Sequence, residues 1–329
     1  MFYEYSDELI RYTGRWGEET DENGIKVGCM TATTTGAYFE FAFKGEQVVL
    51  QFQLAPQSAV VPHLWVSVDG GARVECSVMP YLRVQAMTEG IHTVCVIIKS
   101  ANEVLSRWRR PLVSCVSLCG IEAEALCPLP DDTRKIIEFV GDSITEGVVI
   151  DEPYLPAGDP DMNRLFQNDV CGTYAWLTAE ALGLRPIIMG YGSVGATTGG
   201  RGGVPKGYLA YPYNYDGSPI CCAEPDYVVI NHGTNDRGVT DEAYCADYSK
   251  LLDTIRRLHP HTKIIAMAVF YDVHSEALEQ LVKDYNKEYK TDVSFVNAAG
   301  WVPREPLHPL RDGHKLAADK LTQALKNIL

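Results

Sequence analysis

The stretch "KIIEFVGDSITEG", Lys135–Gly147, decides how the C-terminal half of the chain is expected to fold. It opens with an almost continuous apolar run, made of Ile136, Ile137, Phe139 and Val140. Such a run is typical of a parallel strand that is buried on both of its faces. The run stops abruptly at Gly141, Asp142 and Ser143, which form a small polar turn. Because packing does not call for a polar turn after a buried strand, we interpret Ser143 as a functional residue.

Strand-like and helix-like segments alternate from Lys135 to the end of the chain. The apolar runs "PIIMGYG", "DYVVINHG" and "KIIAMAVF" alternate with amphipathic segments such as "DEAYCADYSKLLDTIRRL" and "SEALEQLVKDYNKEY". This alternation predicts an α/β fold, a parallel sheet with helices on both faces. Ligands of such sheets bind outside the carboxyl ends of the strands. We therefore expect functional residues in the loops that follow the strands.

The N-terminal part of the chain has a different character. Short alternating segments such as "AYFEFAFKG", "EQVVLQFQL" and "IHTVCVIIKS" are separated by turns that contain glycine. They predict an all-β domain, either a β-sandwich or a jelly roll. The stretch "CPLPDDTRK", with two prolines and several charges, is interpreted as a linker. We therefore expect two domains, residues 1–130 and residues 131–329.

The composition excludes several classes of partner. The 329 residues carry a formal net charge of −14, with 46% hydrophobic and 22% charged residues, as in ordinary globular proteins. An acidic chain repels phosphate backbones and anionic lipids, so we expect no nucleic acid and no membrane as partners. The N-terminus "MFYEYSDELIRYTGRW" lacks the basic and apolar regions of a secretory signal, which predicts a cytoplasmic protein.

No cofactor is indicated. The ten cysteines are scattered, without a CxxC pair or a Cys/His spacing that suits zinc, so we expect reduced thiols and no metal site. The sequence also lacks GxxxxGK[ST] and a GxGxxG that joins a strand to a helix, so neither ATP nor NAD is expected. The oligomeric state is not indicated by any pattern in the sequence.

Ser143 has two interpretations. Taken alone it fits a helix N-cap, and "SITE" has the capping-box spacing with Glu146. As a nucleophile it needs a base and N–H donors for an oxyanion. His308 offers an imidazole from the loop after the last strand, because Pro309 disfavours helix at the residue before it. Both residues are expected at one edge of the sheet, so we predict Ser143 as nucleophile and His308 as general base.

Two other loops contain candidate oxyanion donors. Gly195 lies in "GYGSVGATTGGRGG", and glycine lets a backbone N–H approach a substrate closely, although a flexible surface loop is the alternative. Asn235 in "NHGTNDRG" carries a neutral NH₂ donor, although asparagine is also common in turns. His232 is interpreted as a packed strand residue, and His314 as a structural or surface residue.

These loops together resemble the SGNH hydrolases, also called GDSL hydrolases. The blocks "GDSITEG", "GSVGATT", "GTND" and "HPLRDGH" occur in the family's order, and the resemblance covers Lys135 to Leu329. It implies a flavodoxin-like hydrolase domain in which Ser143 is the nucleophile and His308 the base. It also implies an oxyanion hole made of the Ser143 N–H, the Gly195 N–H and the Asn235 side chain.

The sequence departs from that family beside the histidine. The family usually has an aspartate three residues before the histidine, which orients the imidazole ring, whereas this chain has Glu305 in "EPLH". Glutamate is longer by one methylene and Pro306 follows it, so Glu305 either accepts the Nδ1 proton of His308 or points away. We predict Glu305 as the third catalytic residue. A Ser–His dyad, as in some relatives, is the alternative.

The N-terminal half carries a second resemblance. Its "TGR" stretch, its β-rich pattern and the order of the domains are similar to carbohydrate esterase family 2, in which a jelly roll precedes the hydrolase domain. This resemblance implies an acetylesterase that removes O-acetyl groups from acetylated xylan- or mannan-derived oligosaccharides. The alternatives are a short-chain lipase, thioesterase or arylesterase with the same machinery, and a carbohydrate-binding protein with an inert hydrolase domain.

Two further segments are candidates for lining the substrate cleft. They are residues 148–172, which are acidic and contain aromatic residues, and Tyr208–Ile220, which is rich in tyrosine. Long loops often carry function, and tyrosine rings can stack on sugars. Packing between the two domains explains both segments equally well.

Overall fold

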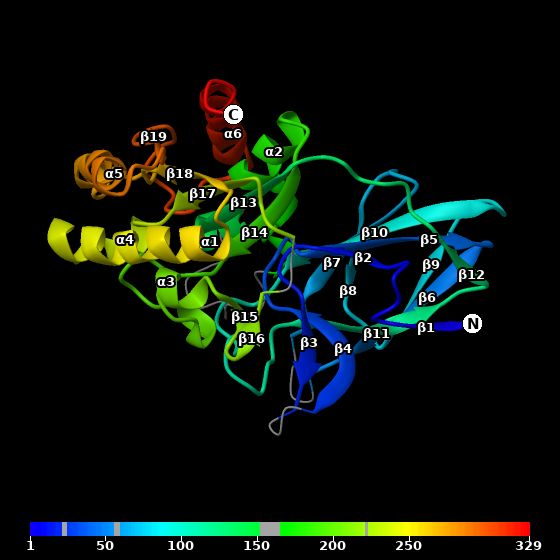
Figure 1. Cartoon of the computed structure of the whole chain (residues 1–329). Helices are drawn as coiled ribbons and strands as arrows, with labels where there is room; N and C mark the ends of the chain where they lie inside the picture. Colours follow the sequence, from blue (N-terminus) through cyan, green and yellow to red (C-terminus); the bar gives the residue numbers. More distant parts are fainter. Residues whose placement is uncertain (22–24, 56–59, 152–164, 221–222) are drawn as a thin grey trace.

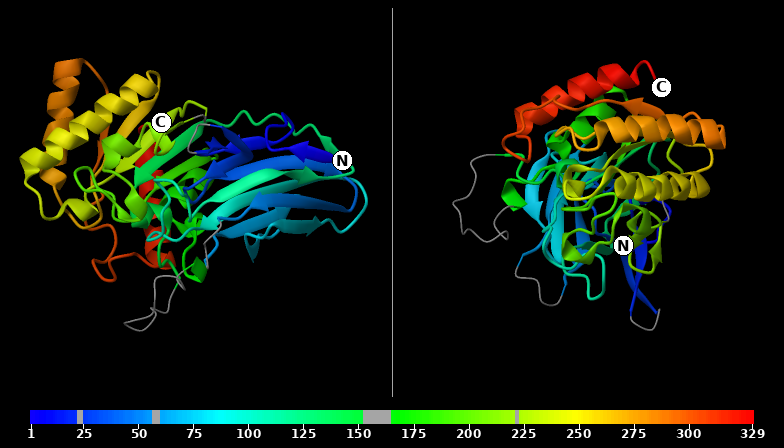
Figure 2. Two further views of the ribbon diagram at one scale, coloured as in Figure 1. Left: turned by 90° about the horizontal axis from the view of Figure 1, so that it is seen from below. Right: turned by 90° about the vertical axis from the view of Figure 1, so that its left-hand side faces the viewer.

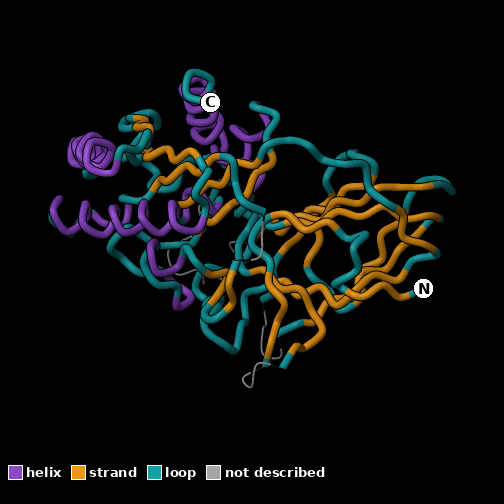
Figure 3. The backbone as a smooth tube through the Cα atoms, in the orientation of Figure 1, coloured by secondary structure: helices purple, strands orange, loops and turns teal. Residues whose placement is uncertain are grey.

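The structure is a computed structural model that describes residues 1–21, 25–55, 60–151, 165–220 and 223–329. It has a β part, which ends at Cys127, and an α/β part, which begins at Ile136 (Figure 1). The two parts lie side by side, and the chain begins at the end of the β part that is remote from the helices (Figure 2). All the α-helices of the described residues belong to the α/β part (Figure 3).

The β part consists of two antiparallel sheets. The first contains β1 (Phe2–Glu4), β3 (Gly17–Thr20), β4 (Lys26–Ala32), β6 (Gln47–Gln53), β9 (Tyr81–Gln85) and β11 (Val116–Glu122), in the order β3-β4-β11-β6-β9 with β1 also on β11. The second contains β2 (Arg11–Thr13), β5 (Tyr38–Lys44), β7 (His63–Val68), β8 (Val74–Ser77), β10 (Ile91–Ser100) and β12 (Ala125–Cys127), in the order β12-β5-β10-β7-β8 with β2 also on β5. The predicted β-sandwich is therefore confirmed.

Alternating side chains explain the sandwich. In β6, Val48, Leu50 and Phe52 are buried, whereas the glutamines at both ends are exposed. Strand β5 contributes Phe39, Phe41 and Phe43 to the same core. A strand with one apolar and one polar face buries the apolar face against a second sheet. The two sheets therefore share one core.

The α/β part contains a parallel sheet. Its strands are β13 (Ile136–Gly141), β14 (Arg185–Gly190), β17 (Tyr227–Asn231), β18 (Lys263–Met267) and β19 (Ser294–Val296), in the order β14-β13-β17-β18-β19. The helices are α1 (Ser143–Glu146), α2 (Tyr174–Ala181), α3 (Gly207–Ala210), α4 (Asp241–Leu258), α5 (Ser275–Tyr289) and α6 (Arg311–Leu325). Short 3₁₀ turns η2 (Val170–Gly172), η3 (Arg201–Gly203) and η4 (Thr234–Asp236) and the hairpin β15 (Tyr213–Tyr215) and β16 (Ser218–Pro219) complete it.

Helices cover both faces of this sheet, as predicted. On one face, α2 and α6 pack against residues such as Phe139 and Val229. On the other face, α3, α4 and α5 pack against residues such as Val140 and Ile230. Every residue of β13 is buried, as its apolar run requires. Figure 1 shows β13 inside the sheet, between β14 and β17, so the loop after it opens between the loops of these two strands.

The two parts share a buried polar interface. The Arg15 Nε, from the segment after β2, donates to Glu138 Oε1 on β13 at 2.9 Å. The two side chains are 0% and 1% exposed. The Tyr211 hydroxyl also donates to this carboxylate, at 2.6 Å to Oε2. The predicted boundary between the two domains, at residue 130, lies in the connection between β12 and β13.

The segment Tyr208–Ile220 packs against the β part. Tyr211 and Tyr215 are buried, and the guanidiniums of Arg15 and Arg110 lie over their rings at 4.6 and 5.1 Å. Tyr211 and Tyr215 therefore pack between the two parts and do not line a substrate cleft. Most of the other candidate segment, residues 152–164, lies outside the described residues.

Replacing Arg15 with methionine should destabilise the protein strongly. The substitution leaves Glu138 as a buried carboxylate without its cation, which costs about 3–5 kcal/mol of unfolding free energy. Arg11→Met is the control, because the Arg11–Glu40 pair is 28% and 21% exposed and its loss should cost less than about 1 kcal/mol. Chemical denaturation measures both. Equal losses in the two variants would contradict this account of the interface.

Candidate active site

Ser143 and His308 lie in hydrogen-bond contact. Ser143 is the first residue of α1, directly beyond the end of β13, and its side chain is nearly buried. His308 lies in the loop between β19 and α6, and its Nε2 is 2.9 Å from Ser143 Oγ. The two residues are 165 positions apart in the chain. The fold therefore brings together the alcohol and the imidazole that the sequence marks as nucleophile and base.

Asp142, rather than Ser143, caps the helix of the nucleophile. Asp142 Oδ1 accepts the Ile144 N–H at 2.9 Å, and α1 ends at Gly147, which has a φ of 88°. The interpretation of Ser143 as an N-cap is therefore wrong. Glu146 does not close a capping box either, because its carboxylate is held by Arg107 and by the Gly192 N–H. The Ser143 hydroxyl is thus left to face His308.

Asn235 lies beside the nucleophile turn. It is in η4, which follows β17. Its Nδ2 donates to the Val194 carbonyl oxygen at 3.1 Å and to Asp142 Oδ2 at 3.3 Å. Among the residues that the structure describes, the Ser143 N–H donates to no backbone acceptor. Both groups belong to loops at the carboxyl edge of the sheet.

Gly195 lies against the loop that carries Asn235. A Cβ at Gly195 would come within 2.3 Å of Asp236 Oδ1, so no larger residue fits there. The Asp236 carboxylate accepts the N–H groups of Ala196, at 2.7 Å, and Thr197, at 3.0 Å, which holds the glycine-rich loop in place. The Gly195 N–H itself donates to the Thr198 carbonyl oxygen at 2.8 Å. In this structure the predicted oxyanion donor is thus bonded within its own loop.

Glu305 does not contact His308. Its side chain is exposed, and within the described part of the chain it has no hydrogen bond to the imidazole. It lines a cleft of about 590 Å³ together with Arg237, Tyr271 and Arg304. The Tyr271 hydroxyl donates to the Leu307 carbonyl oxygen at 2.6 Å, which fixes the backbone next to His308. The structure therefore brings Ser143 and His308 together but leaves Glu305 apart from them.

Sequence patterns do not predict the roles of two residues near this site, Asp236 and Arg107. Asp236 holds the glycine-rich loop, and "GTND" marked its position without indicating its partners. Arg107 belongs to the β part, and its guanidinium pairs with Glu146 of α1. No local motif around Arg107 indicates this contact, because the two residues are 39 positions apart and in different parts of the fold.

His232 and His314 are buried structural residues. Desolvation by burial lowers the pKa of His232 to about 4 and that of His314 to about 3. The His314 Nδ1 accepts the Tyr174 N–H at 3.1 Å, and the two rings are stacked. Imidazoles that stay neutral in this way serve as packing and capping groups.

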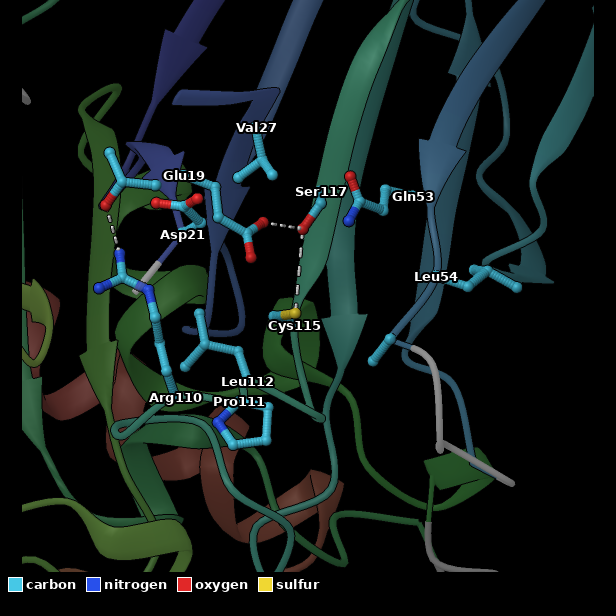
Figure 4. A pocket seen from close by; sticks show the side chains of 12 residues that line it. Glu19, Asp21, Val27, Gln53, Leu54, Arg110, Pro111, Leu112, Cys115 and Ser117 are labelled. Atoms are coloured by element: carbon cyan, nitrogen blue, oxygen red, sulfur yellow. Dashed lines mark hydrogen bonds between the residues drawn. The ribbon is translucent and has the colours of Figure 1, made fainter. Parts of the chain in front are cut away.

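A second cleft lies in the β part (Figure 4). Its polar side chains bond largely to one another: Ser117 Oγ donates to Glu19 Oε2 at 3.2 Å, and Arg110 donates to Thr20 Oγ1 at 2.9 Å. None of the predicted site residues lines it. This cleft is therefore separate from the Ser143 site.

Two further features are absent from the described residues, namely a membrane-spanning helix and a metal-binding group. None of their helices is both long enough and apolar enough to cross a lipid bilayer. Nor do three or more of their His, Cys, Asp or Glu side chains gather in a group that could bind a metal ion.

The Asp142 carboxyl should make stability depend on pH. Burial raises its pKa from 3.8 to about 7, against the lowering effect of the Ile144 N–H. Between these values the folded chain holds a proton that the unfolded chain has lost, so the group's contribution to stability falls as pH rises from about 4 to 7 and is constant above that. In Asp142→Asn this decline is absent.

The measurement is the difference in unfolding free energy between Asp142→Asn and the wild type, by denaturation across pH 4–8. The difference should rise in favour of the variant by roughly 4 kcal/mol up to pH 7. The buried histidines titrate in both proteins and cancel. A difference that does not change with pH would show that Asp142 is not a buried, protonated carboxyl.

Comparison with solved structures finds the same two-part fold. A family two carbohydrate esterase from Cellvibrio japonicus is 19% identical, with a TM-score of 0.80 over 100% of this chain and 97% of that chain. An acetyl xylan esterase from the rumen bacterium Butyrivibrio proteoclasticus is 17% identical, with a TM-score of 0.75 over 99% and 98%. A salicylyl-acyltransferase from a tetracycline biosynthetic pathway is 15% identical, with a TM-score of 0.65 over 100% and 99%.

At these identities the likeness establishes the fold, in which an N-terminal β part is joined to an SGNH-type domain, and not the substrate. No curated protein sequence matches the chain. The GDSL-like Lipase/Acylhydrolase family matches residues 139–316, more than half of the chain, and this range includes Ser143, Asn235 and His308. The chain therefore belongs to the GDSL-like lipase/acylhydrolase family.

Proposed function

We propose that this protein is a serine esterase that removes O-acetyl groups from carbohydrates, with xylan- or mannan-derived oligosaccharides as substrates. The observation that carries the proposal is the contact of 2.9 Å between Ser143 Oγ and His308 Nε2 at the carboxyl edge of the parallel sheet. A serine hydroxyl that is hydrogen-bonded to an imidazole can lose its proton to that base and attack an acyl group. Family membership supports hydrolysis of an ester bond.

The reaction proceeds in two steps. In the first, His308 takes the proton of Ser143 Oγ while the oxygen attacks the acetyl carbonyl carbon. His308 then gives this proton to the sugar oxygen, and the sugar leaves an acetyl ester on Ser143. In the second, a water molecule gives a proton to His308 and attacks the acetyl group. Acetate leaves, and Ser143 regains its proton from His308.

The oxyanion is stabilised by neutral N–H donors. The Ser143 N–H and the Asn235 amide belong to the nucleophile turn and its neighbour, and within the described residues the Asn235 Nδ2 donates at 3.1 and 3.3 Å. Donors of this kind tighten when charge develops on the substrate oxygen. Gly195 takes part as a donor once its N–H leaves the Thr198 carbonyl oxygen.

The orientation of His308 is a separate question. Because Glu305 is exposed and not hydrogen-bonded to His308, we do not propose Glu305 as the residue that orients the imidazole. Glu305 then contributes to substrate binding. Together with Arg237 and Arg304 it lines the cleft beside the His308 loop, where charged side chains can bond to sugar hydroxyls.

This polar cleft favours a sugar over a long acyl chain. Its lining residues include four charged ones, namely Arg237, Asp272, Arg304 and Glu305, beside Tyr271, Val273 and Leu307, whereas a site for a long fatty acyl chain requires a continuous apolar wall. Of the three structural neighbours described above, one is named a family two carbohydrate esterase, one an acetyl xylan esterase and one an acyltransferase. The fold therefore supports acyl transfer in general, and the cleft supports a carbohydrate.

Ser143→Ala should abolish hydrolysis of an aryl acetate, because the nucleophile is lost. Asn235→Ala should lower kcat by about 10²–10³, the usual cost of one oxyanion donor. Steady-state kinetics measures both, and circular dichroism checks that the variants fold. Wild-type turnover in Ser143→Ala would refute the assignment of the nucleophile.

Glu305→Gln tests whether Glu305 orients the catalytic histidine. Loss of a carboxylate that orients the catalytic histidine costs roughly 10⁴ in turnover. We expect kcat on an aryl acetate to change by less than about tenfold instead. On an acetylated oligosaccharide, KM should rise because the cleft loses a charged hydrogen-bond acceptor. A large fall in kcat on both substrates would restore Glu305 as the third catalytic residue.

The substrate class is tested by a panel of acetylated xylo- and manno-oligosaccharides, with mass spectrometry to follow acetate loss. We expect faster deacetylation of these sugars than hydrolysis of longer acyl esters, because the cleft is polar. A clear preference for octanoyl over acetyl esters would favour a lipase or thioesterase. Binding of the sugars without any deacetylation would favour a carbohydrate-binding protein.

A further inference from the structure

A segment of the β part reaches the glycine-rich loop of the active site. Residues 101–115 connect β10 to β11 without regular secondary structure, and connections of this length are uncommon in compact domains. Arg107 lies in this segment and its side chain is completely buried. Its backbone N–H donates to the Gly202 carbonyl oxygen at 3.2 Å. The β part thus contacts the loop that contains Gly195.

The Arg107 guanidinium holds Glu146 at two points. Nη2 donates to Glu146 Oε2 at 2.9 Å, and Nη1 donates to Oε1. The guanidinium also lies over the Tyr191 ring, 4.9 Å from its centre. A two-point contact between guanidinium and carboxylate fixes the orientation of both groups. Glu146 is 2% exposed, so water does not compete for this pair.

The Glu146 carboxylate joins the two segments on which the proposed chemistry depends. Glu146 is the last residue of α1, which begins with the nucleophile Ser143. Its Oε2 accepts the Gly192 N–H at 2.7 Å, three residues before Gly195. A second residue of the β part, Thr35, donates through Oγ1 to the Glu146 carbonyl oxygen at 3.0 Å.

We propose that Arg107 is a positioning residue of the active site, which acts through Glu146 to hold the nucleophile turn against the glycine-rich loop. The β part is then a component of the esterase machinery rather than an attached binding module. The proposal rests on the esterase function proposed above. It assigns the effect to one contact, so it differs from a general stabilisation of the fold by packing of the two parts.

The pair Arg15–Glu138 provides a matched control. It also joins the β part to the α/β part, and it is equally buried. Glu138, however, lies in the middle of β13, five residues before Ser143, and its carboxylate bonds to Arg15 and Tyr211 rather than to the glycine-rich loop. Loss of this pair should affect folding without a specific effect on turnover.

Removal of Arg107 alone leaves a buried carboxylate without its cation, and such a variant can fail to fold. The test therefore uses double variants that remove both charges. Arg107→Met/Glu146→Gln keeps an amide oxygen that can accept the Gly192 N–H. Arg107→Met/Glu146→Met removes the acceptor as well. Arg15→Met/Glu138→Gln is the control.

Two measurements are made on the full-length folded proteins. The first is kcat on an aryl acetate, corrected for the active-site concentration. The second is amide hydrogen exchange of peptides that cover residues 141–147 and 190–204, which reports local opening of the two segments. The methionine double variant should lose at least about tenfold in kcat and exchange faster in both peptides. The glutamine double variant should recover part of both effects, and the control should show neither.

Equal kcat and equal local exchange in the methionine double variant and the Arg15 control would overturn the proposal while the esterase function stands. If the wild type hydrolyses no ester, the proposed function fails, and hydrogen exchange still decides the positioning role. Faster exchange confined to the two peptides supports that role, and unchanged exchange contradicts it.

Discussion

Two carboxylates of the α/β part have their guanidinium partners in the β part, and this constraint governs the molecule. Glu138 pairs with Arg15 and Glu146 pairs with Arg107, and all four side chains are at most 2% exposed. Charges taken out of water are tolerated only when they are paired and hydrogen-bonded. The two parts therefore cannot separate without leaving buried charges uncompensated or exposing the core beneath them. The structural unit is the whole chain.

Both carboxylates flank the nucleophile turn. Glu138 lies within β13, and Glu146 ends α1, with Ser143 between them. The parallel sheet adds the other groups, because Asn235 follows β17 and His308 follows β19 at the same edge. Carboxyl ends of parallel strands are where such folds place their ligands. The site is thus assembled from distant segments by the sheet and held in register by the β part.

Local patterns in the sequence predict a large share of this arrangement. The amphipathic segments that begin at Asp241 and Ser275 are helices α4 and α5 over the same residues, because apolar residues at helical spacing must face the sheet. The polar turn after the apolar run of β13 marks Ser143, and the loop positions of Asn235 and His308 follow from the strand order. These are properties of a few neighbouring residues.

Other contacts depend on pairings that no local pattern contains. Arg15 meets Glu138 across 123 positions, so their sequence neighbourhoods do not indicate the contact. A position three residues before the histidine favours Glu305 as its partner by analogy, yet the loop leads that side chain into the cleft of Arg237 and Arg304. The same holds for Gly195, whose N–H direction is set by the Thr198 carbonyl oxygen. Loop paths decide such details, and the path of a loop follows from tertiary contacts.

We propose that a single alcohol, activated by one imidazole, performs the acyl transfer. A fluorophosphonate reacts covalently with activated serine hydroxyls, and peptide mapping by mass spectrometry locates the adduct. We predict that the label falls on Ser143 and that esterase activity disappears in proportion to the labelled fraction. Full activity after complete labelling of Ser143, or loss of activity with the label on another residue, would contradict the account.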